Sequence, residues 1–394
     1  MSPTYDFLII GGGIFGAAAT VALAQRGYTT ALFDPGPLPH PLAATTDISK
    51  VIRMEYGTNE QYMAMAEASL PVWRQWNALF GQTLYHETGV TFLSHNEMQP
   101  GTFEYESYHM LLKRGHRPER LNAAEISRRF PAWNTAVHTD GFYHAQGGYA
   151  ESGKVLTALI QLAQSLGTAL YEGESVEQLH IENGRVTGIY TQTGHYTGRH
   201  TIIAAGAWTP LLLPELRPYM RATGHPVFHL KTDQPHLFTP PAFVTFGADT
   251  AKTGWYGFPL HPTEGVIKIA RHSDGMVLHP QNDARIVTQA DEAALRAFLI
   301  ETFPALANAP IVYTRRCLYC DTLDEHFWIS RHPQLEGLTV ATGGSGHGFK
   351  FAPVLGDLIA DAALGIENDW LPLFQWRDLS ANTTGLEAAR HHEE

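Results

Sequence analysis

A glycine-rich turn near the N-terminus constrains the fold more than any other stretch of this sequence. The apolar run from Asp6 to Ile10 leads directly into GGGIFG, where Gly11, Gly13 and Gly16 form a GxGxxG pattern. A helical run of Ala and Leu follows, and a second apolar run ends at Asp34. Strand, glycine turn, helix and strand in this order predict a βαβ unit with a dinucleotide-binding fingerprint.

Each part of this unit has a task in dinucleotide binding. Gly11 allows the tight turn, Gly13 lets backbone N–H groups approach a pyrophosphate, and Gly16 lets the helix close on the strand. The N–H groups and partial positive charge of the helix N-terminus then hold the phosphates. Asp34 can accept hydrogen bonds from a ribose diol, and its charge would repel a 2′-phosphate. The motif alone does not separate FAD from NAD.

Length and charge favour a large globular protein with two domains. The chain has 394 residues, more than one ordinary hydrophobic core accommodates. Lys and Arg number 27 against 39 Asp and Glu, and this formal charge of −12 disfavours nucleic acid and anionic membrane surfaces as partners. We expect no membrane span and no targeting segment. Because the sequence has only 2 cysteines, we expect a protein of the reducing cytoplasm.

Helix and strand patterns recur along the chain. Apolar residues at helical intervals predict helices over about 60–80, 104–113 and 291–303. The strand-like run TIIAAGAW and the later strand, glycine loop and helix at 337–365 belong beside the dinucleotide-binding sheet. Between them, an Asn183-Gly184 pair predicts a hairpin.

The order of these patterns predicts an α/β fold whose chain crosses between two domains more than once. We predict a Rossmann-like cofactor domain with an interleaved substrate domain built on a mainly antiparallel sheet. The cofactor domain comprises 1–82, 148–210 and 315–380, the substrate domain comprises 83–147 and 211–314, and 381–394 forms a polar tail.

Three local signals allow more than one interpretation. Lys50 and Arg53 would share one face of a helical turn, either as a solvated basic turn or as part of a site. Cys317 and Cys320 form a CxxC pair, but two cysteines cannot fill a tetrahedral zinc site, so we predict no metal; a thioredoxin-type disulfide is the alternative. His347, in GGSGHGFK, is either a base or a packed loop histidine.

Five stretches carry a longer pattern: GGGIFG at 11–16, SKVIR at 49–53, WYGFP at 255–259 with GVIKIARH, RRCLY at 315–319 with TLDEHF, and SGHGFKF at 345–351. Together they resemble the FAD-dependent amine oxidases of the D-amino-acid-oxidase superfamily, in the group of monomeric sarcosine oxidases and N-methyltryptophan oxidases. The resemblance spans nearly the whole chain and implies FAD rather than NAD.

The resemblance also implies that FAD is attached covalently. Cys317 matches the cysteine that carries the flavin through a thioether, which leaves Cys320 without a required role. The other positions assigned to FAD binding are Gly11, Gly13, Ile14, Phe15, Gly16, Asp34, Ser49, Lys50, Val176, Ala205, Gly206, Trp208, Gly344, Gly346, His347, Gly348 and Lys350.

For the substrate, the resemblance implies a carboxylate site between aromatic residues. Arg53 and Lys350 match the pair that holds the carboxylate. A planar guanidinium can grip a carboxylate bidentately and a lysine adds a compact charge, so the chemistry agrees. Tyr256 and Tyr319 match aromatic residues over the substrate; core packing is the alternative for either.

Lys268 and His272 repeat the KxxxH spacing of these oxidases. Lys268 matches the lysine near flavin N5, where a cation can stabilise superoxide as O2 takes its first electron. His272 would shape and polarise the substrate pocket. Residues four apart in a strand face the same side, so both could point at the flavin. Without the resemblance, either would be a solvated strand residue.

The resemblance implies a monomeric oxidase that converts the C–N bond of a small secondary amino acid, such as sarcosine, to an imine and reduces O2 to H2O2. Lys50 stands where sarcosine oxidases carry arginine, and DISK and the CDT at 320–322 also resemble fructosyl amino acid oxidases. That substrate class is one alternative. A dehydrogenase that passes electrons to a quinone or partner protein is a second, and a non-catalytic FAD-binding protein is a third.

Overall fold

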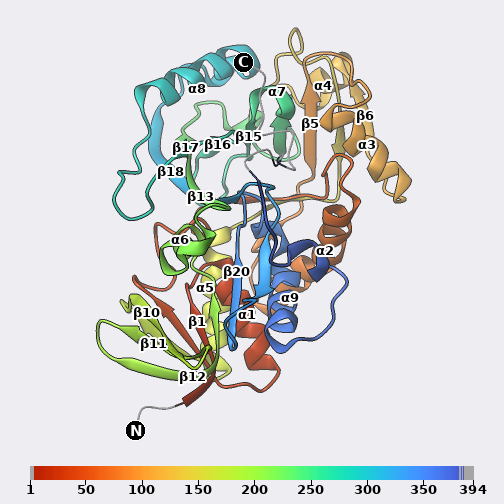
Figure 1. The fold of residues 1–394 in the computed structure, drawn as a ribbon. Coiled ribbons are helices and arrows are strands. Elements are labelled where there is room, and N and C mark those ends of the chain that lie inside the picture. The colour runs from red at the N-terminus through yellow and green to blue at the C-terminus, as the bar shows by residue number, and fades with distance from the viewer. Residues whose placement is uncertain (1–3, 381–382, 384, 386–394) are drawn as a thin grey trace.

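The protein is described by a computed structural model that covers residues 4–380, 383 and 385. The predicted polar tail at 381–394 therefore lies, apart from two positions, outside the described residues. Within them the chain forms two large sheets, one in each half of the molecule, and helices packed around both (Figure 1).

The first sheet contains the predicted βαβ unit. Strands β1 (Thr4–Ile10) and β2 (Thr30–Asp34) pair in parallel, and α1 (Ile14–Gln25) connects them. Helix α1 is apolar on all sides and is buried between the sheet, α5 (Ser152–Ser165) and α9 (Ala352–Leu364). The parallel pairing and the connecting helix confirm the Rossmann-like unit.

The other strands of this sheet come from distant parts of the chain. The sheet runs β10-β11-β12-β1-β2-β9, and β20 and β19 are added beside β12. Strand β12 is parallel to β1 and contains only the first three residues of the predicted strand TIIAAGAW, because the chain turns into a short helix at Gly206–Trp208. The Asn183-Gly184 turn joins β10 to β11, as predicted. The bounds are β9 (Ala169–Glu172), β10 (Val176–Glu182), β11 (Arg185–Thr191), β12 (His195–Ile203), β19 (Trp328–Arg331) and β20 (Leu338–Thr342).

The second sheet is antiparallel except where β14 meets β5. Its order is β17-β13-β16-β15-β14-β5-β7-β6, and β18 lies on β13. The bounds are β5 (Val90–Ser94), β6 (Glu119–Asn122), β7 (Asp140–His144), β13 (Met220–Leu230), β14 (Thr245–Ala248), β15 (Trp255–Gly257), β16 (Ile267–Arg271), β17 (Met276–Val277) and β18 (Ile311–Thr322). Because β18 pairs along almost its whole length with β13, the expected domain boundary at residue 315 falls inside this sheet.

The predicted helical turn at Lys50 and Arg53 is wrong. Residues Lys50–Ile52 form strand β3, which pairs with β8 (Gly148–Ala150) in a small sheet completed by β4 (Tyr85–His86). Backbone hydrogen bonds to β8 hold the segment extended, a tertiary contact that the local spacing does not reveal. Lys50 and Arg53, which follows the end of the strand, nevertheless line the same pocket.

The long predicted helices are confirmed with small shifts at their ends. They are α2 (Glu60–Leu79), α3 (Phe103–Lys113) and α8 (Gln289–Thr302). Side chains cap two of them, since Asn59 accepts the N–H of Tyr62 and Thr288 forms a capping box with Asp291. The remaining α-helices are α4 (Ala123–Arg129), α6 (Thr209–Leu212) and α7 (Thr250–Thr253). None of the helices in the described part of the chain is long and apolar enough to span a bilayer.

Candidate active site

Most of the glycines predicted to bind the cofactor lie where parallel strands of the first sheet end. The GxGxxG turn follows β1, the short helix Gly206–Trp208 follows β12, and the glycine loop at 343–348 follows β20. The N–H of Ala204 donates to the carbonyl of Ile10 at 2.8 Å, which joins the first two of these ends. The carboxyl edge of such a sheet is where open α/β folds bind ligands.

Two glycines of the motif cannot be replaced without moving backbone. Gly11 has φ +102°, and a Cβ there would lie 2.5 Å from the carbonyl oxygen of Ala204. A Cβ on Gly16 would lie 1.9 Å from the carbonyl oxygen of Gly11. Gly13, in contrast, would meet nothing closer than 3.7 Å, which leaves room beside the start of α1. With no acidic residue in the first turn of α1, its positive end suits a pyrophosphate.

Asp34 is the last residue of β2, and its carboxylate hydrogen-bonds the glycine turn. Its carboxylate accepts the N–H of Gly12 at 2.8 Å and the N–H of Gly36 at 3.1 Å. Burial raises the pKa of this carboxyl, and the two N–H groups work against that rise. Each carboxylate oxygen has a further lone pair, so binding of a ribose diol stays a prediction. Val176 lies close by, since the N–H of Glu174 donates to the Asp34 carbonyl at 2.9 Å.

One face of the second sheet carries the residues predicted to surround the flavin and substrate. Alternation along β18 puts Cys317 and Tyr319 on this face, where they pack with Val227, Ala270 and Tyr256 of the neighbouring strands. Leu318 and Cys320 point the opposite way, into the core that borders the first sheet. Strand β18 therefore places the two pairs of residues on opposite faces of the second sheet.

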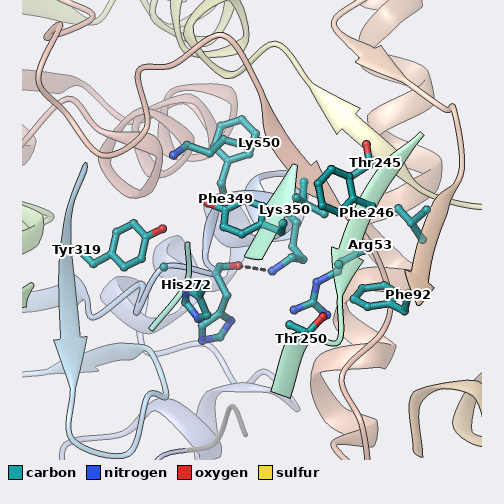
Figure 2. Close-up of a pocket in the computed structure, with 16 residues that line it drawn as sticks. Lys50, Arg53, Phe92, Thr245, Phe246, Thr250, His272, Tyr319, Phe349 and Lys350 are labelled. Carbon is teal, nitrogen blue, oxygen red and sulfur yellow. Dashed lines mark hydrogen bonds between the residues drawn. The ribbon is translucent and has the colours of Figure 1, made fainter. Parts of the chain in front are cut away.

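A pocket opens beside this face and brings the predicted substrate residues together (Figure 2). Its walls come from the second sheet, the small sheet, and the glycine loop with the short helix that follows it. The lining residues are Lys50, Val51, Arg53, Val90, Phe92, Thr245, Phe246, Gly247, Thr250, Tyr256, His272, Tyr319, Gly346, His347, Phe349 and Lys350. Five of the six residues predicted to be catalytic line it; the sixth, Lys268, was predicted to act on O2 and lies outside this lining, buried at 1% exposure.

Arg53 and Lys350 approach each other around a tyrosine that the sequence reasoning did not select. The Lys350 ammonium donates to the Tyr56 hydroxyl at 2.7 Å. The Arg53 guanidinium lies 4.8 Å from the centre of the Tyr56 ring and is also within 6 Å of the Phe92 ring. Figure 2 shows the two cationic groups pointing toward the same part of the pocket. A carboxylate there would meet one guanidinium and one ammonium.

A directed chain of hydrogen bonds fixes Lys350. His347 bonds the Glu325 carbonyl through Nε2 at 3.0 Å, which requires a proton on Nε2 and leaves Nδ1 as an acceptor. The Tyr56 hydroxyl therefore donates to Nδ1 at 3.0 Å and accepts from Lys350. His347 is thus a packed loop histidine in this structure, and it orients the tyrosine that holds Lys350.

Lys268 donates to two buried oxygens. Its ammonium lies 2.6 Å from Asp47 Oδ2 and 2.5 Å from the Ser49 carbonyl oxygen. Burial lowers the pKa of Lys268 to about 8, although the Asp47 carboxylate opposes that change. His272 follows the same strand, and its ring centre lies 5.9 Å from that of Tyr319. Neither residue is a solvated strand residue of the second sheet.

Comparison with known proteins decides the family. A family model described as FAD-dependent oxidoreductase matches residues 6–362, most of the chain. The chain belongs to the family of FAD-dependent oxidoreductases. It is 29% identical to monomeric sarcosine oxidase of Bacillus sp. (strain B-0618) over 92% of this chain and 93% of that relative. It is also 29% identical to N-methyl-L-tryptophan oxidase of Salmonella newport (strain SL254), over 92% of this chain and 95% of that protein.

Solved structures agree with the fold of this FAD-dependent oxidoreductase. Fructosamine oxidase (Amadoriase II) of Aspergillus fumigatus superposes with a TM-score of 0.81 at 25% identity, covering 98% of this chain and 91% of that one. L-proline dehydrogenase of P. horikoshii superposes with a TM-score of 0.82 at 20% identity, which speaks for the fold alone. The predicted α/β fold and the predicted FAD family are confirmed.

The two cysteines of the oxidoreductase are free, and β18 turns them to opposite faces. The Cys317 sulfur lies 4.0 Å from the Lys50 ammonium and 3.8 Å from the Ala44 carbonyl oxygen, on the face that borders the pocket. The Cys320 sulfur accepts from the Thr342 hydroxyl at 3.6 Å, and burial raises its pKa to about 11. The thioredoxin-type disulfide is therefore wrong, since a three-residue offset in a strand separates the two thiols.

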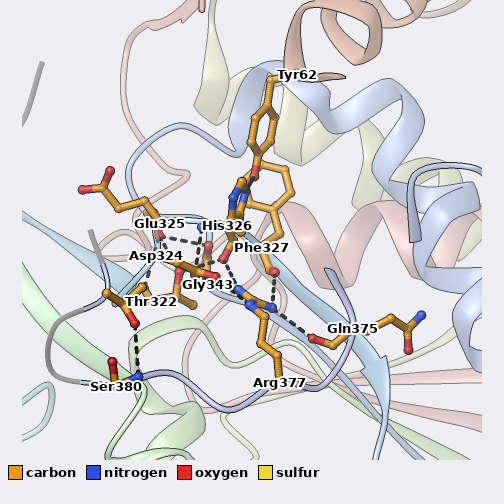
Figure 3. A network of polar contacts seen from close by, with 12 residues as sticks. Tyr62, Thr322, Asp324, Glu325, His326, Phe327, Gly343, Gln375, Arg377 and Ser380 are labelled. Atoms are coloured by element: carbon orange, nitrogen blue, oxygen red, sulfur yellow. Dashed lines mark hydrogen bonds and ion pairs between the residues drawn. The ribbon is translucent and has the colours of Figure 1, made fainter. Parts of the chain in front are cut away.

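The TLDEHF loop of the oxidoreductase, which supplies the Glu325 carbonyl to His347, is clamped by the C-terminal segment (Figure 3). The Arg377 guanidinium pairs bidentately with Asp324 at 2.6 and 2.8 Å and also donates to the carbonyls of His326 and Phe327. Burial would raise the pKa of Asp324, but the bonds from Arg377 outweigh it and lower that pKa. Arg377 thus supports the series of hydrogen bonds that runs from Glu325 through His347 and Tyr56 to Lys350.

We expect Arg377→Ala to lower the free energy of unfolding by about 2–3 kcal/mol, because a half-buried carboxylate loses its charged partner and two carbonyls lose a donor. Urea denaturation followed by circular dichroism measures the change. Arg199→Ala is the control, since that side chain is 78% exposed and pairs only at the surface with Asp6. Equal losses in the two variants would contradict the clamp.

Sequence reasoning missed residues that act through contacts with distant segments. Asp47 and Tyr56 flank the SKVIR stretch, and both bind lysines more than 200 positions away. The short DISK and MEYG stretches were the only local signals for them. His225 stacks on Tyr319 with ring centres 4.1 Å apart, and nothing in its own segment pointed to the site.

Proposed function

We propose that this FAD-dependent oxidoreductase oxidises the C–N bond of a small secondary amino acid to an imine and passes the electrons to O2, giving H2O2. The observation that carries the proposal is the convergence of Arg53 and Lys350 on one aromatic-walled pocket beside the face that holds Cys317 and Lys268. The substrates named for its relatives, sarcosine and N-methyl-L-tryptophan, support amines of this class.

The protein would contribute mainly position and charge. Arg53 and Lys350 would hold the substrate carboxylate, while Tyr256 and Tyr319 cover the reacting carbon and exclude water. His272, at the edge of the pocket, would polarise the amine end. FAD, when bound, supplies the two-electron oxidation itself. On release, the imine hydrolyses to an aldehyde or oxo acid and a free amine.

The transfer of electrons to O2 would depend on Lys268. A buried ammonium on the flavin side of the sheet would stabilise the anion that forms when O2 takes one electron. The dehydrogenase alternative needs no such cation. Reoxidation in air that is slow, and equally slow in Lys268→Met, would favour electron transfer to a quinone or protein.

An anaerobic amine panel tests the proposal. Sarcosine, N-methyltryptophan, proline and fructosyl glycine are mixed separately with the FAD-loaded protein, and bleaching of the flavin absorbance is followed by stopped flow. Bleaching by an N-methyl amino acid is the expected result. Bleaching by fructosyl glycine alone would identify a fructosyl amino acid oxidase, the class that DISK and the fold similarity to fructosamine oxidase support. No bleaching by any amine would contradict amine oxidation.

Covalent attachment of FAD is a separate prediction. We expect acid-denatured protein to carry the mass of one FAD, because the Cys317 sulfur lies on the pocket face beside Lys50. Cys317→Ser should release the flavin into the supernatant. Cys320→Ser is the matched control and should keep the added mass, because that thiol faces the opposite core. Unmodified wild-type protein with yellow supernatant would rule out the thioether.

A further inference from the structure

We propose that Asp47 is the positioning residue that holds the Lys268 ammonium charged and fixed at the flavin-facing side of the second sheet. This inference rests on the proposed oxidase function and assigns a role in its O2 step. Asp47 would act only through Lys268 and would touch neither substrate nor O2.

The pair is built as a buried unit. The Lys268 and Asp47 side chains are 1% and 3% exposed, and Nζ lies 2.6 Å from Oδ2. The Ser49 carbonyl oxygen takes a second hydrogen bond, and the Phe258 ring centre lies 4.8 Å from Nζ. Two of the three ammonium donors are therefore directed, which fixes where the charge lies.

The Asp47 backbone is anchored as well. Its carbonyl oxygen accepts the Ser152 hydroxyl at 3.0 Å and the Gly153 N–H at 2.9 Å, both from the start of α5. The start of α5, which packs on α1, thus holds the Asp47 backbone, and strand β16 holds Lys268. The ion pair therefore connects the helices that pack on the first sheet to the second sheet, which borders the pocket.

The surroundings explain why the lysine needs this partner. Besides Lys268, Asp47 faces His229 at 3.7 Å from β13, Lys50 from β3 and Arg315 from β18, and Cys317 lies near the lysine. Burial lowers the pKa of Lys268, Lys50 lowers it further, and the Asp47 carboxylate raises it. Burial would also raise the pKa of Asp47, but the cations outweigh it and hold that pKa well below its usual range. Without Asp47, burial and Lys50 would both disfavour the charged form of Lys268, and its one carboxylate partner would be gone.

The test follows reoxidation after photoreduction, so that no amine is needed and a failure of the proposed substrate class does not affect it. In Asp47→Asn we expect the second-order rate of reoxidation by O2 at pH 7.5 to fall about tenfold for each pH unit by which the Lys268 pKa drops below the assay pH. Lowering the pH should restore the rate. Asp233→Asn, an exposed carboxylate, is the control. A wild-type pH profile in Asp47→Asn would overturn the proposal.

A double-mutant cycle separates this role from a structural one. In Lys268→Met, which lacks the charge, adding Asp47→Asn should slow reoxidation no further. Urea unfolding of the flavin-free proteins gives a second readout: Asp47→Asn should destabilise the protein strongly when Lys268 is present and little when it is Met. Equal effects in both backgrounds, in either measurement, would overturn the proposal.

A charge-conserving variant covers the case in which Asp47→Asn does not fold. Asp47→Glu keeps the anion, and we expect it to keep reoxidation within about threefold of wild type with the same pH dependence, because a carboxylate still reaches the ammonium. If the double variant, which carries both Asp47→Asn and Lys268→Met, folds where Asp47→Asn alone does not, that result would support the pairing. A pH profile in Asp47→Glu shifted to lower pH would overturn it.

Discussion

Arg53→Ala is expected to lower kcat/KM for carboxylated amines by about 30- to 5,000-fold, because removing one partner of a desolvated charge pair typically costs about 2–5 kcal/mol. The guanidinium is preorganised by its place over the Tyr56, Phe92 and Phe103 rings, so a carboxylate would bind it with little loss of side-chain freedom. Steady-state kinetics with the amine identified by the panel, and with its methyl ester, measure the effect. The ester should lose much less than the acid.

The matched control is Arg129→Ala. Arg129 also lies over an aromatic ring, with its guanidinium 3.8 Å from the centre of Tyr143, but it pairs with Glu119 and does not line the pocket. Its replacement should leave kcat/KM within about twofold, as expected for a surface ion pair. An equal loss for acid and ester in Arg53→Ala would show that Arg53 supports the pocket rather than the carboxylate.

Gly16→Ala should remove the cofactor and much of the stability together. The added methyl would lie 1.9 Å from the Gly11 carbonyl oxygen, and because that atom belongs to the backbone, the glycine turn itself has to shift. We expect the free energy of unfolding to fall by about 3 kcal/mol, at the upper end for overpacking a buried site. The purified variant should carry little FAD. Flavin absorbance at purification and urea denaturation of flavin-free protein measure the two effects separately.

Gly194→Ala is the control for this substitution. A Cβ there would meet nothing within 4 Å, and the residue has no positive φ, so neither stability nor FAD content should change by more than the error of the measurement. If Gly16→Ala retained full FAD and stability, the close approach of α1 to β1 would be contradicted.

Elements whose signal lies within a few consecutive residues were predictable from the sequence. The Gly11 turn, the Asn183-Gly184 hairpin and helix α2 each depend on local backbone chemistry or on one apolar stripe, and each is found where the sequence places it. The resemblance supplied the substrate residues, and Arg53 and Lys350 do line one pocket. Their roles stay predictions.

The remainder depends on tertiary pairing. Lys50 lies in a strand because β8, about 100 residues later, offers a backbone partner, and no local pattern encodes that contact. Asp47 could not be assigned from its own loop, because its importance comes from Lys268 on a strand of the second sheet. His347 could be interpreted only after the Tyr56 and Glu325 contacts fixed its tautomer.

In strand β18, the number of residues decides which side chains face the pocket. Cys317 and Tyr319 face the pocket only because side chains alternate, and Leu318 and Cys320 fill the core behind them. Deleting one residue before Cys317 would exchange the two sets, turning a leucine toward the pocket and the predicted anchor into the core. An insertion or deletion in this wall therefore changes both faces at once, whereas a substitution changes only one, so redesign of the pocket should keep the length of the strand.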